Sequence, residues 1–272
     1  DECKSMRQWV EVQDQSAIAV VRRAARSLAA RHNWPKLRID ELAIVATEAT
    51  TNILRYAEQG RVLIDAPAEG KGDVILMIFT DRGPGISDMD HMFQDGMSSG
   101  DSAGLGLGAI RRLSSAFDIF SGPEVGTTIV CSFAKDAPRP THGVQVTEQL
   151  IGKRGAVAAL VHIAHPQMEL RYAALGNIAT LRVRDGEIKR LPVRDGRIGA
   201  RATRGYEESF DLVPNDLLIL HSDGLKTLRD SYLPQGLLWK SPLLIAGFLL
   251  DRAFRGRDDA SIAVIRIARD AD

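Results

Sequence analysis

The stretch Asp73-Val-Ile-Leu-Met-Ile-Phe-Thr-Asp81-Arg-Gly-Pro-Gly85 joins a run of apolar residues to an aspartate and two glycines. The apolar and β-branched run before Asp81 is typical of a buried strand. Glycines allow backbone to approach a ligand closely, and an aspartate at a strand end can accept a hydrogen bond from an exocyclic amine. The stretch therefore predicts a ligand site at the end of a buried strand.

A helix is predicted before this strand, from about Asp40 to Tyr56. Apolar residues recur along it at helical spacing, at Leu42, Val45, Ala46, Ala49 and Ile53. Glu48 and Asn52 are four residues apart, so they share one face of the helix, opposite the apolar stripe. Such a pair also occurs on ordinary solvated surfaces, and alone it leaves both interpretations open.

The third element is Gly104-Leu-Gly-Leu-Gly108, and a helix is predicted to follow Gly108. The free N–H groups and the positive dipole end of a helix start suit bound phosphates. One glycine motif alone is usually a turn. The three elements in this order and spacing predict an ATP site.

A linker at residues 135–143, which contains two prolines and a glycine, is predicted to separate two domains, 1–136 and 144–272. Before it, a strand at Trp9–Val12, a helix from Ser16 to Trp34-Pro35, and strands at Phe117–Ser121 and Thr127–Phe133 complete an α+β sandwich. After it, Asp185-Gly186 is a hairpin turn. The strands expected there are Ala156–His162, Glu169–Ala174, Thr180–Arg184, Glu187–Leu191, Asp216–His221 and Ser261–Ile267, with a helix at Ser241–Phe254.

The composition excludes several classes of protein. Among 272 residues, 35 Lys and Arg balance 35 Asp and Glu, so the protein has no net charge that would attract it to nucleic acid or to an anionic membrane. The longest apolar run, Pro242–Leu250, is far below the roughly 18 residues that span a bilayer. With only Cys3 and Cys131, the chain has no disulfide framework or cysteine-based zinc site. We expect a cytoplasmic protein without nucleic-acid or membrane partners.

The first half resembles the GHKL (Bergerat) ATPases over roughly residues 5 to 134. The resemblance lies in their N, G1 and G2 boxes, matched by Glu48-xxx-Asn52, Asp81-x-Gly83-x-Gly85, Gly104-x-Gly106-x-Gly108 and the closing Gly126-Thr127. With Asp95-Gly-Met-Ser-Ser99 leading into the last box, the sequence is most similar to the bacterial anti-sigma-factor serine kinases, and among them to the RsbT-type switch kinases.

This resemblance implies ATP and Mg²⁺ as cofactors and a serine kinase activity. Asn52 would coordinate Mg²⁺, and Glu48 would be the general base that accepts the proton of the attacking serine. Asp81, Gly83 and Gly85 would form the adenine pocket. Residues 88–103 would be a lid, and the remaining nucleotide contacts would come from Gly104, Gly106, Gly108 and Thr127.

The second half resembles the later motifs of the PP2C-type phosphatases, in the SpoIIE/RsbX branch, over roughly residues 150 to 269. The matching stretches are Ala174-Leu-Gly-Asn-Ile178, His221-Ser-Asp-Gly-Leu225 and Arg257-Asp-Asp-Ala-Ser261. The resemblance implies a β-sandwich flanked by helices, with Asp223 and Asp258 as ligands of Mn²⁺ or Mg²⁺ and Asp259 as an outer partner. Acidic turns at strand ends are also common as solvated loops.

This half departs from the family pattern. The early Gly-Asp and the Asp-Gly-x-Gly-His-Gly turn, which supply the bridging carboxylate in the family, do not occur in this half of the sequence. Either several tens of residues of the natural chain are missing here, which we favour, or the phosphatase is degenerate. Two carboxylates alone could not hold a dinuclear centre.

From Arg182 to Arg204 the sequence contains eight Lys or Arg residues but only three Asp or Glu residues. They are either solvated strand faces or a docking surface for an acidic or phosphorylated protein. Together the two halves predict a bifunctional partner-switching regulator that phosphorylates a serine on a STAS-domain anti-anti-sigma protein and removes phosphate through its second domain. The alternative is an anti-sigma factor or scaffold that sequesters its partner, such as a sigma factor, with an inactive phosphatase domain.

Overall fold

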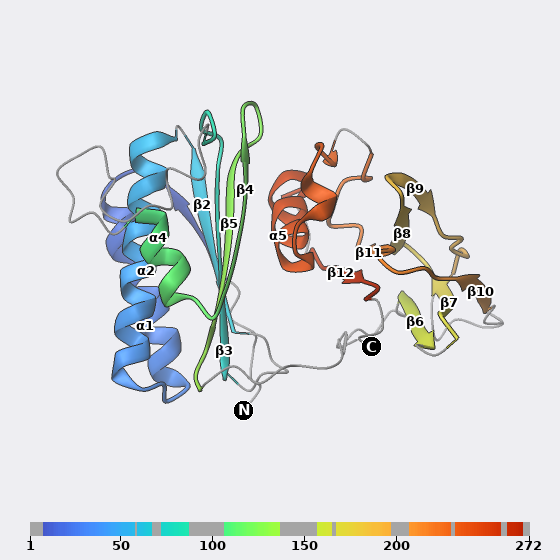
Figure 1. The fold of residues 1–272 in the computed structure, drawn as a ribbon, viewed down its shortest axis with the longest axis horizontal. Coiled ribbons are helices and arrows are strands. Elements are labelled where there is room, and N and C mark those ends of the chain that lie inside the picture. The colour runs from blue at the N-terminus through green and yellow to red at the C-terminus, as the bar shows by residue number, and fades with distance from the viewer. Residues whose placement is uncertain are drawn as a thin grey trace. The chain divides into compact units, whose positions relative to one another are not determined.

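The chain forms two compact units, Asp1–Pro140 and Thr141–Asp272 (Figure 1). The computed structural model describes nine stretches of it, residues 8–57, 59–66, 72–86, 106–136, 157–164, 167–196, 207–229, 232–256 and 260–268. Of the expected linker at residues 135–143, residues 137–143 lie outside them.

The first unit is a five-stranded antiparallel sheet with helices on one face (Figure 1). The strand order is β1-β2-β3-β5-β4. The strands are β1 (Gln8–Val12), β2 (Gly60–Asp65), β3 (Val74–Asp81), β4 (Ala116–Gly122) and β5 (Gly126–Ala134). The helices are α1 (Ser16–Arg31), α2 (Lys36–Tyr56) and α4 (Gly106–Leu113). β3, the strand that carries Asp81, therefore lies in the middle of the sheet.

The core of this unit lies between the helices and the sheet. The apolar stripe predicted for α2 is buried at every position. It packs in one cluster with alternate residues of β3, namely Ile75, Met77 and Phe79, as the two-residue period of a strand requires. Cys131 of β5 belongs to the same cluster, and burial raises the pKa of its thiol to about 12, so the thiol is not reactive.

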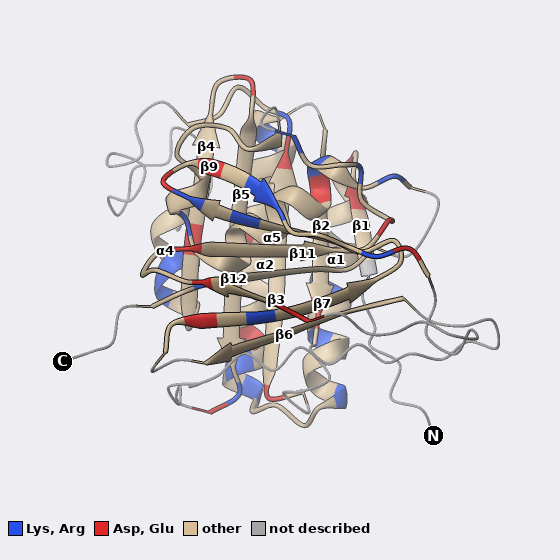
Figure 2. Cartoon of the chain, turned by 90° about the vertical axis from the view of Figure 1, so that its right-hand side faces the viewer, with Lys and Arg blue, Asp and Glu red and all other residues tan. Residues whose placement is uncertain are grey.

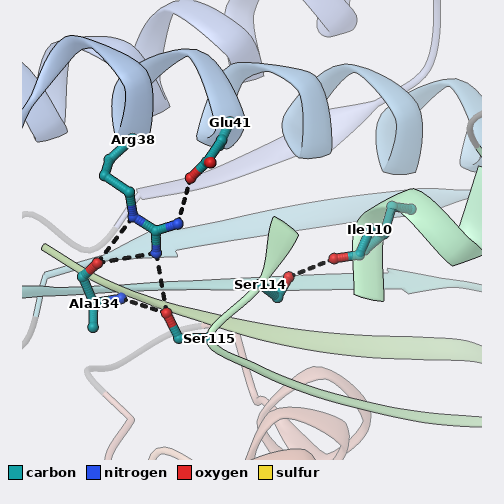
Figure 3. A network of polar contacts seen from close by, with 6 residues as sticks. All are labelled: Arg38, Glu41, Ile110, Ser114, Ser115 and Ala134. Carbon is teal, nitrogen blue, oxygen red and sulfur yellow. Dashed lines mark hydrogen bonds and ion pairs between the residues drawn. The ribbon is translucent and has the colours of Figure 1, made fainter. Parts of the chain in front are cut away.

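Arg38 ties the start of α2 to the sheet (Figure 3). Its guanidinium donates to the carbonyl oxygen of Ala134 from Nε at 3.2 Å and from one terminal nitrogen at 3.0 Å. The same terminal nitrogen donates to Oγ of Ser115 at 3.1 Å, and Glu41 pairs with the other terminal nitrogen. The helix carrying Glu48 and Asn52 is thereby fixed against the end of β5.

The second unit contains two antiparallel sheets. A three-stranded sheet has the order β10-β7-β6, and a four-stranded sheet has the order β12-β11-β8-β9. The strands are β6 (Ala158–Ala164), β7 (Glu169–Leu175), β8 (Ala179–Arg184), β9 (Glu187–Arg190), β10 (Glu208–Asp211), β11 (Leu217–His221) and β12 (Ile262–Arg266). One buried cluster joins Leu170 and Tyr172 of the first sheet to Leu218 of the second. The two sheets therefore pack as a sandwich.

In the described part of this unit, the helical elements are α5 (Pro242–Ala253), which contacts β12, and a short 3₁₀ helix at Leu237–Trp239. Ser241 caps α5 by accepting a hydrogen bond from the backbone N–H of Leu244 at 3.4 Å. The predicted hairpin turn at Asp185-Gly186 is confirmed, since both residues have positive φ, as a type I′ turn requires. The α+β fold class is confirmed.

Two helix starts differ from the prediction. α2 begins at Lys36 rather than Asp40, because Pro35 sits just before the helix in an extended conformation and the helix can start directly after it. α4 begins at Gly106 rather than after Gly108, so Gly108 is a buried residue inside the helix. The strands β2 and β10 were not predicted.

Candidate functional site

The carboxylate of Asp81 organises the end of β3. Its Oδ1 accepts a hydrogen bond from the backbone N–H of Gly83 at 2.9 Å and another from that of Thr127 at 3.0 Å. The first bond shapes the turn that follows β3, and the second joins this turn to the start of β5. Asp81, Gly83 and Thr127, which are far apart in the sequence, thus form one corner of the unit.

The glycines of this corner are required by close backbone contacts. A Cβ at Gly83 would lie 2.7 Å from the carbonyl oxygen of Tyr56, and one at Gly126 would lie 2.2 Å from that of Asp81. Gly85 has φ +78°, and its Cβ would lie 2.4 Å from the carbonyl oxygen of Gly122. Real Cβ atoms do not approach so closely, so only glycine fits at these positions.

A hydroxyl pair closes the corner from β4. Oγ of Ser121 lies 2.8 Å from Oγ1 of Thr127 and accepts a hydrogen bond from the backbone N–H of Ile86 at 2.9 Å. Ser121 is a site residue that the sequence analysis missed, because a serine within a predicted strand gives no signal of its own.

Glu48 and Asn52 lie on α2, half-buried. Tyr56, whose carbonyl faces Gly83, is four residues after Asn52 and eight after Glu48. At 1.5 Å per residue, Asn52 and Glu48 are therefore about 6 Å and about 12 Å along the helix axis from the turn after β3. The hydroxyls of Thr47 and Thr51 each donate to a carbonyl four residues back, at 2.8 Å, so they belong to the helix itself.

The last glycine motif starts α4, which packs against α2. Gly106 has φ +42°, and a Cβ there would meet no atom of the described residues within 4 Å. Gly104 and the expected lid lie outside the described residues. The structure thus brings together Asp81, Gly83, Gly85 and Thr127, with the ends of α2 and α4 on the same face of the sheet (Figure 1).

The second unit contains a pocket of about 490 Å³ beside the predicted acidic turn. Asp223 is exposed in its wall, and its Oδ2 accepts a hydrogen bond from Nδ2 of Asn177 at 3.4 Å. Asp258 and Asp259 lie outside the described residues. Within the described stretches, His, Cys, Asp and Glu do not gather in any group of three or more that could hold a metal ion.

His221 is a buried residue of this pocket's lining and was not predicted as a site residue, although it stands two residues before Asp223. The residue is 5% exposed, and Nδ1 of its ring lies 2.9 Å from the carbonyl oxygen of Ser222. Because a carbonyl only accepts, Nδ1 donates, and Nε2 is left without a partner among the described residues. Burial, together with the positive charges of Arg190 and Arg255, lowers the pKa of this imidazole.

Comparison with known proteins assigns the first unit. Residues 12–133 match the family described as histidine kinase-like ATPase domain. The N-terminal unit carries a histidine kinase-like ATPase domain. The same part of the chain is similar to the serine/threonine-protein kinase RsbT of Bacillus subtilis, with 28% identity over 120 residues, which is 44% of this chain and 90% of RsbT.

Solved structures with some likeness to the chain include phosphatases. The phosphatase domain of the cell fate determinant SpoIIE from Bacillus subtilis is 21% identical at a TM-score of 0.34, over 43% of this chain and 57% of that domain. RsbX in complex with magnesium is 15% identical at a TM-score of 0.34, over 76% of this chain and 92% of RsbX. The chain thus spans little more than half of the SpoIIE domain. None of the described helices is long and apolar enough to cross a membrane.

The two backbone hydrogen bonds that Asp81 accepts predict that substitutions at this position destabilise the first unit to different extents. Asp81→Ala leaves two backbone N–H groups without their acceptor, which we expect to lower the free energy of unfolding of the first unit by about 2–4 kcal/mol. Asp81→Asn keeps an oxygen acceptor and should cost no more than about half of that. Denaturation followed by tryptophan fluorescence measures both.

Both variants are best made in a Trp239→Phe background, because Trp239 is 79% exposed in the second unit, whereas Trp9 and Trp34 report on the first. Equal unfolding midpoints for Asp81→Ala and its parent would contradict the structural role of the carboxylate.

Proposed function

We propose that the chain is a regulator of a bacterial partner-switching pathway, whose first unit transfers the γ-phosphoryl group of ATP to a serine of a STAS-domain protein. One observation carries this proposal. The corner built on Asp81 lies inside the segment that matches the histidine kinase-like ATPase domain and the kinase RsbT. The absence of long apolar helices among the described residues is consistent with action in the cytoplasm.

The geometry of the corner supports nucleotide binding at the end of β3. ATP supplies the transferable phosphoryl group when bound. The carboxylate of Asp81 is held in place by hydrogen bonds from backbone N–H groups, and it would accept a hydrogen bond from the adenine amine. Gly83 and Gly85 would form the wall of the adenine pocket. Thr127 lies beside Asp81 in the same corner. Gly104, together with Gly106 and Gly108 at the start of α4, would hold the phosphates through backbone N–H groups.

Two side chains of α2 would serve phosphoryl transfer. Asn52 would hold Mg²⁺ with its side-chain oxygen, and the Mg²⁺ would offset the negative charge of the phosphates. Glu48, one turn earlier, would accept the proton of the serine hydroxyl as its oxygen attacks the γ-phosphorus and ADP leaves. Both side chains are half-buried on a helix fixed by Arg38, so they are held in place before substrate arrives.

The role of Glu48 is tested with Glu48→Gln. The amide keeps the shape of the side chain but cannot accept a proton, so affinity for Mg-ATP should remain while transfer of labelled phosphate to a STAS-domain protein falls roughly 10²–10⁴-fold. Asp40→Asn is the matched control, since Asp40 lies on the same helix in a largely exposed ion pair with Arg26. Asn52→Ala should instead weaken the binding of Mg-ATP.

Transfer by Glu48→Gln at the rate of Asp40→Asn would show that the base lies elsewhere. Strong sequestration of a sigma factor without any transfer would favour the alternative, an anti-sigma factor or scaffold. That alternative draws support from the second unit, where the described residues do not form a group able to hold a metal ion.

For the second unit we propose that a chain which also carries the missing early metal-ligand segment dephosphorylates the same partner, dependent on Mn²⁺ or Mg²⁺ held in part by Asp223 and Asp258. Among the described residues, the pocket lining supplies the carboxylates of Asp195 and Asp223 and the amide of Asn177, without a group of three or more His, Cys, Asp or Glu side chains, and this set does not fit a dinuclear centre. No hydrolytic step follows from this set, and further carboxylates would have to come from outside the described residues.

The 272-residue chain should therefore bind Mn²⁺ feebly and release no phosphate from a phosphoserine partner, because too few carboxylates offset the charge of two divalent ions. Titration with Mn²⁺ by calorimetry checks this, with Asp223→Ala as the comparison. Tight binding of two ions per chain, or metal-dependent turnover, would mean that the ligands are assigned wrongly.

A further inference from the structure

The polar side chains of the corner in the first unit continue a row of the hydrophobic core. Phe79, Ile129 and Ile119 lie side by side on β3, β5 and β4 and belong to the core between the sheet and the helices. Side chains two residues further along a strand point to the same face of the sheet. In these strands they are the three polar residues of the corner, Asp81, Thr127 and Ser121. The polar row therefore lies on the same face of the sheet as α2 and α4.

This row consists of one carboxylate and two hydroxyls. The strands β3, β4 and β5 contain neither Lys nor Arg, and their acidic residues are Asp81 and Asp118 (Asp and Glu are red, Lys and Arg blue in Figure 2). A carboxylate repels phosphate, whereas a carboxylate and a hydroxyl together can bind the edge of a neutral ring that both donates and accepts hydrogen bonds. The row is therefore suited to the base of a nucleotide rather than to its phosphates.

The hydrogen bonds of Ser121 decide which hydroxyl hydrogen is left for a ligand. Oγ of Ser121 lies 2.8 Å from Oγ1 of Thr127, so one of the two hydroxyls donates to the other. Oγ of Ser121 also accepts a hydrogen bond from the backbone N–H of Ile86 at 2.9 Å. A hydroxyl that accepts a hydrogen bond becomes a stronger donor, because hydrogen bonds in a chain polarise one another. This favours donation from Ser121 to Thr127, which leaves the hydroxyl hydrogen of Thr127 for a ligand.

Burial makes a ligand acceptor valuable at this position. Thr127 is 8% exposed, and among the described residues Ser121 is the hydrogen-bond partner of its hydroxyl. A buried polar hydrogen without an acceptor is costly, so a ligand that presents an acceptor here gains affinity. The direction of this hydrogen is therefore a feature that can select the ligand.

We propose that Ser121 is a positioning residue that directs the hydroxyl hydrogen of Thr127 toward N1 of the adenine ring. This inference rests on the proposed function, because it takes the base of ATP to lie at the corner. Adenine carries its amine, a donor, next to N1, an acceptor. Asp81 accepts from the amine and Thr127 donates to N1, while Ser121 acts through Thr127. The chain of hydrogen bonds that starts at the N–H of Ile86 thus ends at the base.

The test compares the affinities of Mg-ATP and Mg-1-deaza-ATP, in which a C–H group replaces N1 and the amine is kept, by calorimetry on the full chain. The wild type should bind ATP roughly tenfold more tightly than the analogue, because the analogue cannot accept from Thr127. In Ser121→Ala the ratio should fall to about threefold, since the hydroxyl of Thr127 then distributes over three staggered orientations. Loosening of the corner alone would weaken both nucleotides equally and leave the ratio unchanged.

Four further variants complete the comparison. Ser121→Thr keeps a hydroxyl and should restore the tenfold ratio, whereas Ser121→Cys, whose thiol is a weak donor, should lower it and replaces Ser121→Ala if that variant does not fold. Thr127→Val keeps the backbone N–H that donates to Asp81 but should bind both nucleotides equally. Thr128→Val is the matched control with an unchanged ratio, because Thr128 is the next residue and is buried on the opposite face of the sheet.

The outcomes separate this inference from the proposed function. Binding of Mg-ATP with a tenfold ratio in both Ser121→Ala and Ser121→Cys would overturn the positioning role and leave the proposed nucleotide site intact. A ratio near one in the wild type would overturn the contact between Thr127 and N1. Failure of the wild type to bind Mg-ATP at all would overturn the proposed function, and this inference with it.

Discussion

One carboxylate oxygen, Oδ1 of Asp81, accepts two backbone hydrogen bonds, and the candidate nucleotide site depends on them. A single oxygen binds the turn after β3 and the start of β5, two segments that the antiparallel pairing of Thr80 with Thr128 already brings close. The turn is packed so tightly against Tyr56 and Gly122 that Gly83 and Gly85 cannot carry side chains. The adenine pocket that we propose is therefore built from backbone, and its shape is set by hydrogen bonds within the protein before any ligand binds.

In the first unit, the residues that hold the structure in place are different from those that we propose to take part in phosphoryl transfer. The corner around Asp81 is fixed by backbone contacts, while the groups proposed for phosphoryl transfer, Glu48 and Asn52, project from a helix that Arg38 clamps to the sheet. Phosphoryl transfer depends on correctly positioned charges and a correctly positioned general base more than on covalent catalysis by the protein. A central strand and a fixed helix provide such positions with little loss of entropy on binding.

The features that could be predicted from the sequence are those with a local pattern. The apolar stripe from Leu42 to Ile53 predicted the helix α2, and Asp185-Gly186 predicted the hairpin between β8 and β9. β2 was missed because Gly60–Asp65 is short and begins with a glycine and an arginine, and β10 was missed because Glu208-Ser-Phe-Asp211 is mostly polar. The bonds from Asp81 to Thr127 and from Arg184 to Asp216 join residues 46 and 32 positions apart, and no local pattern encodes them. The same is true of Arg190, His221 and Arg255, which line one pocket although they are distant in the sequence.

The most direct test of the central claim is amide hydrogen exchange of the full chain with and without Mg-ATP. If the nucleotide binds at the corner held by Asp81, exchange should slow in residues 81–86, in α4 at residues 106–113 and at the start of β5, and these changes should be lost in Asn52→Ala. Unchanged exchange in these three segments at saturating Mg-ATP, or protection confined to the second unit, would contradict the account.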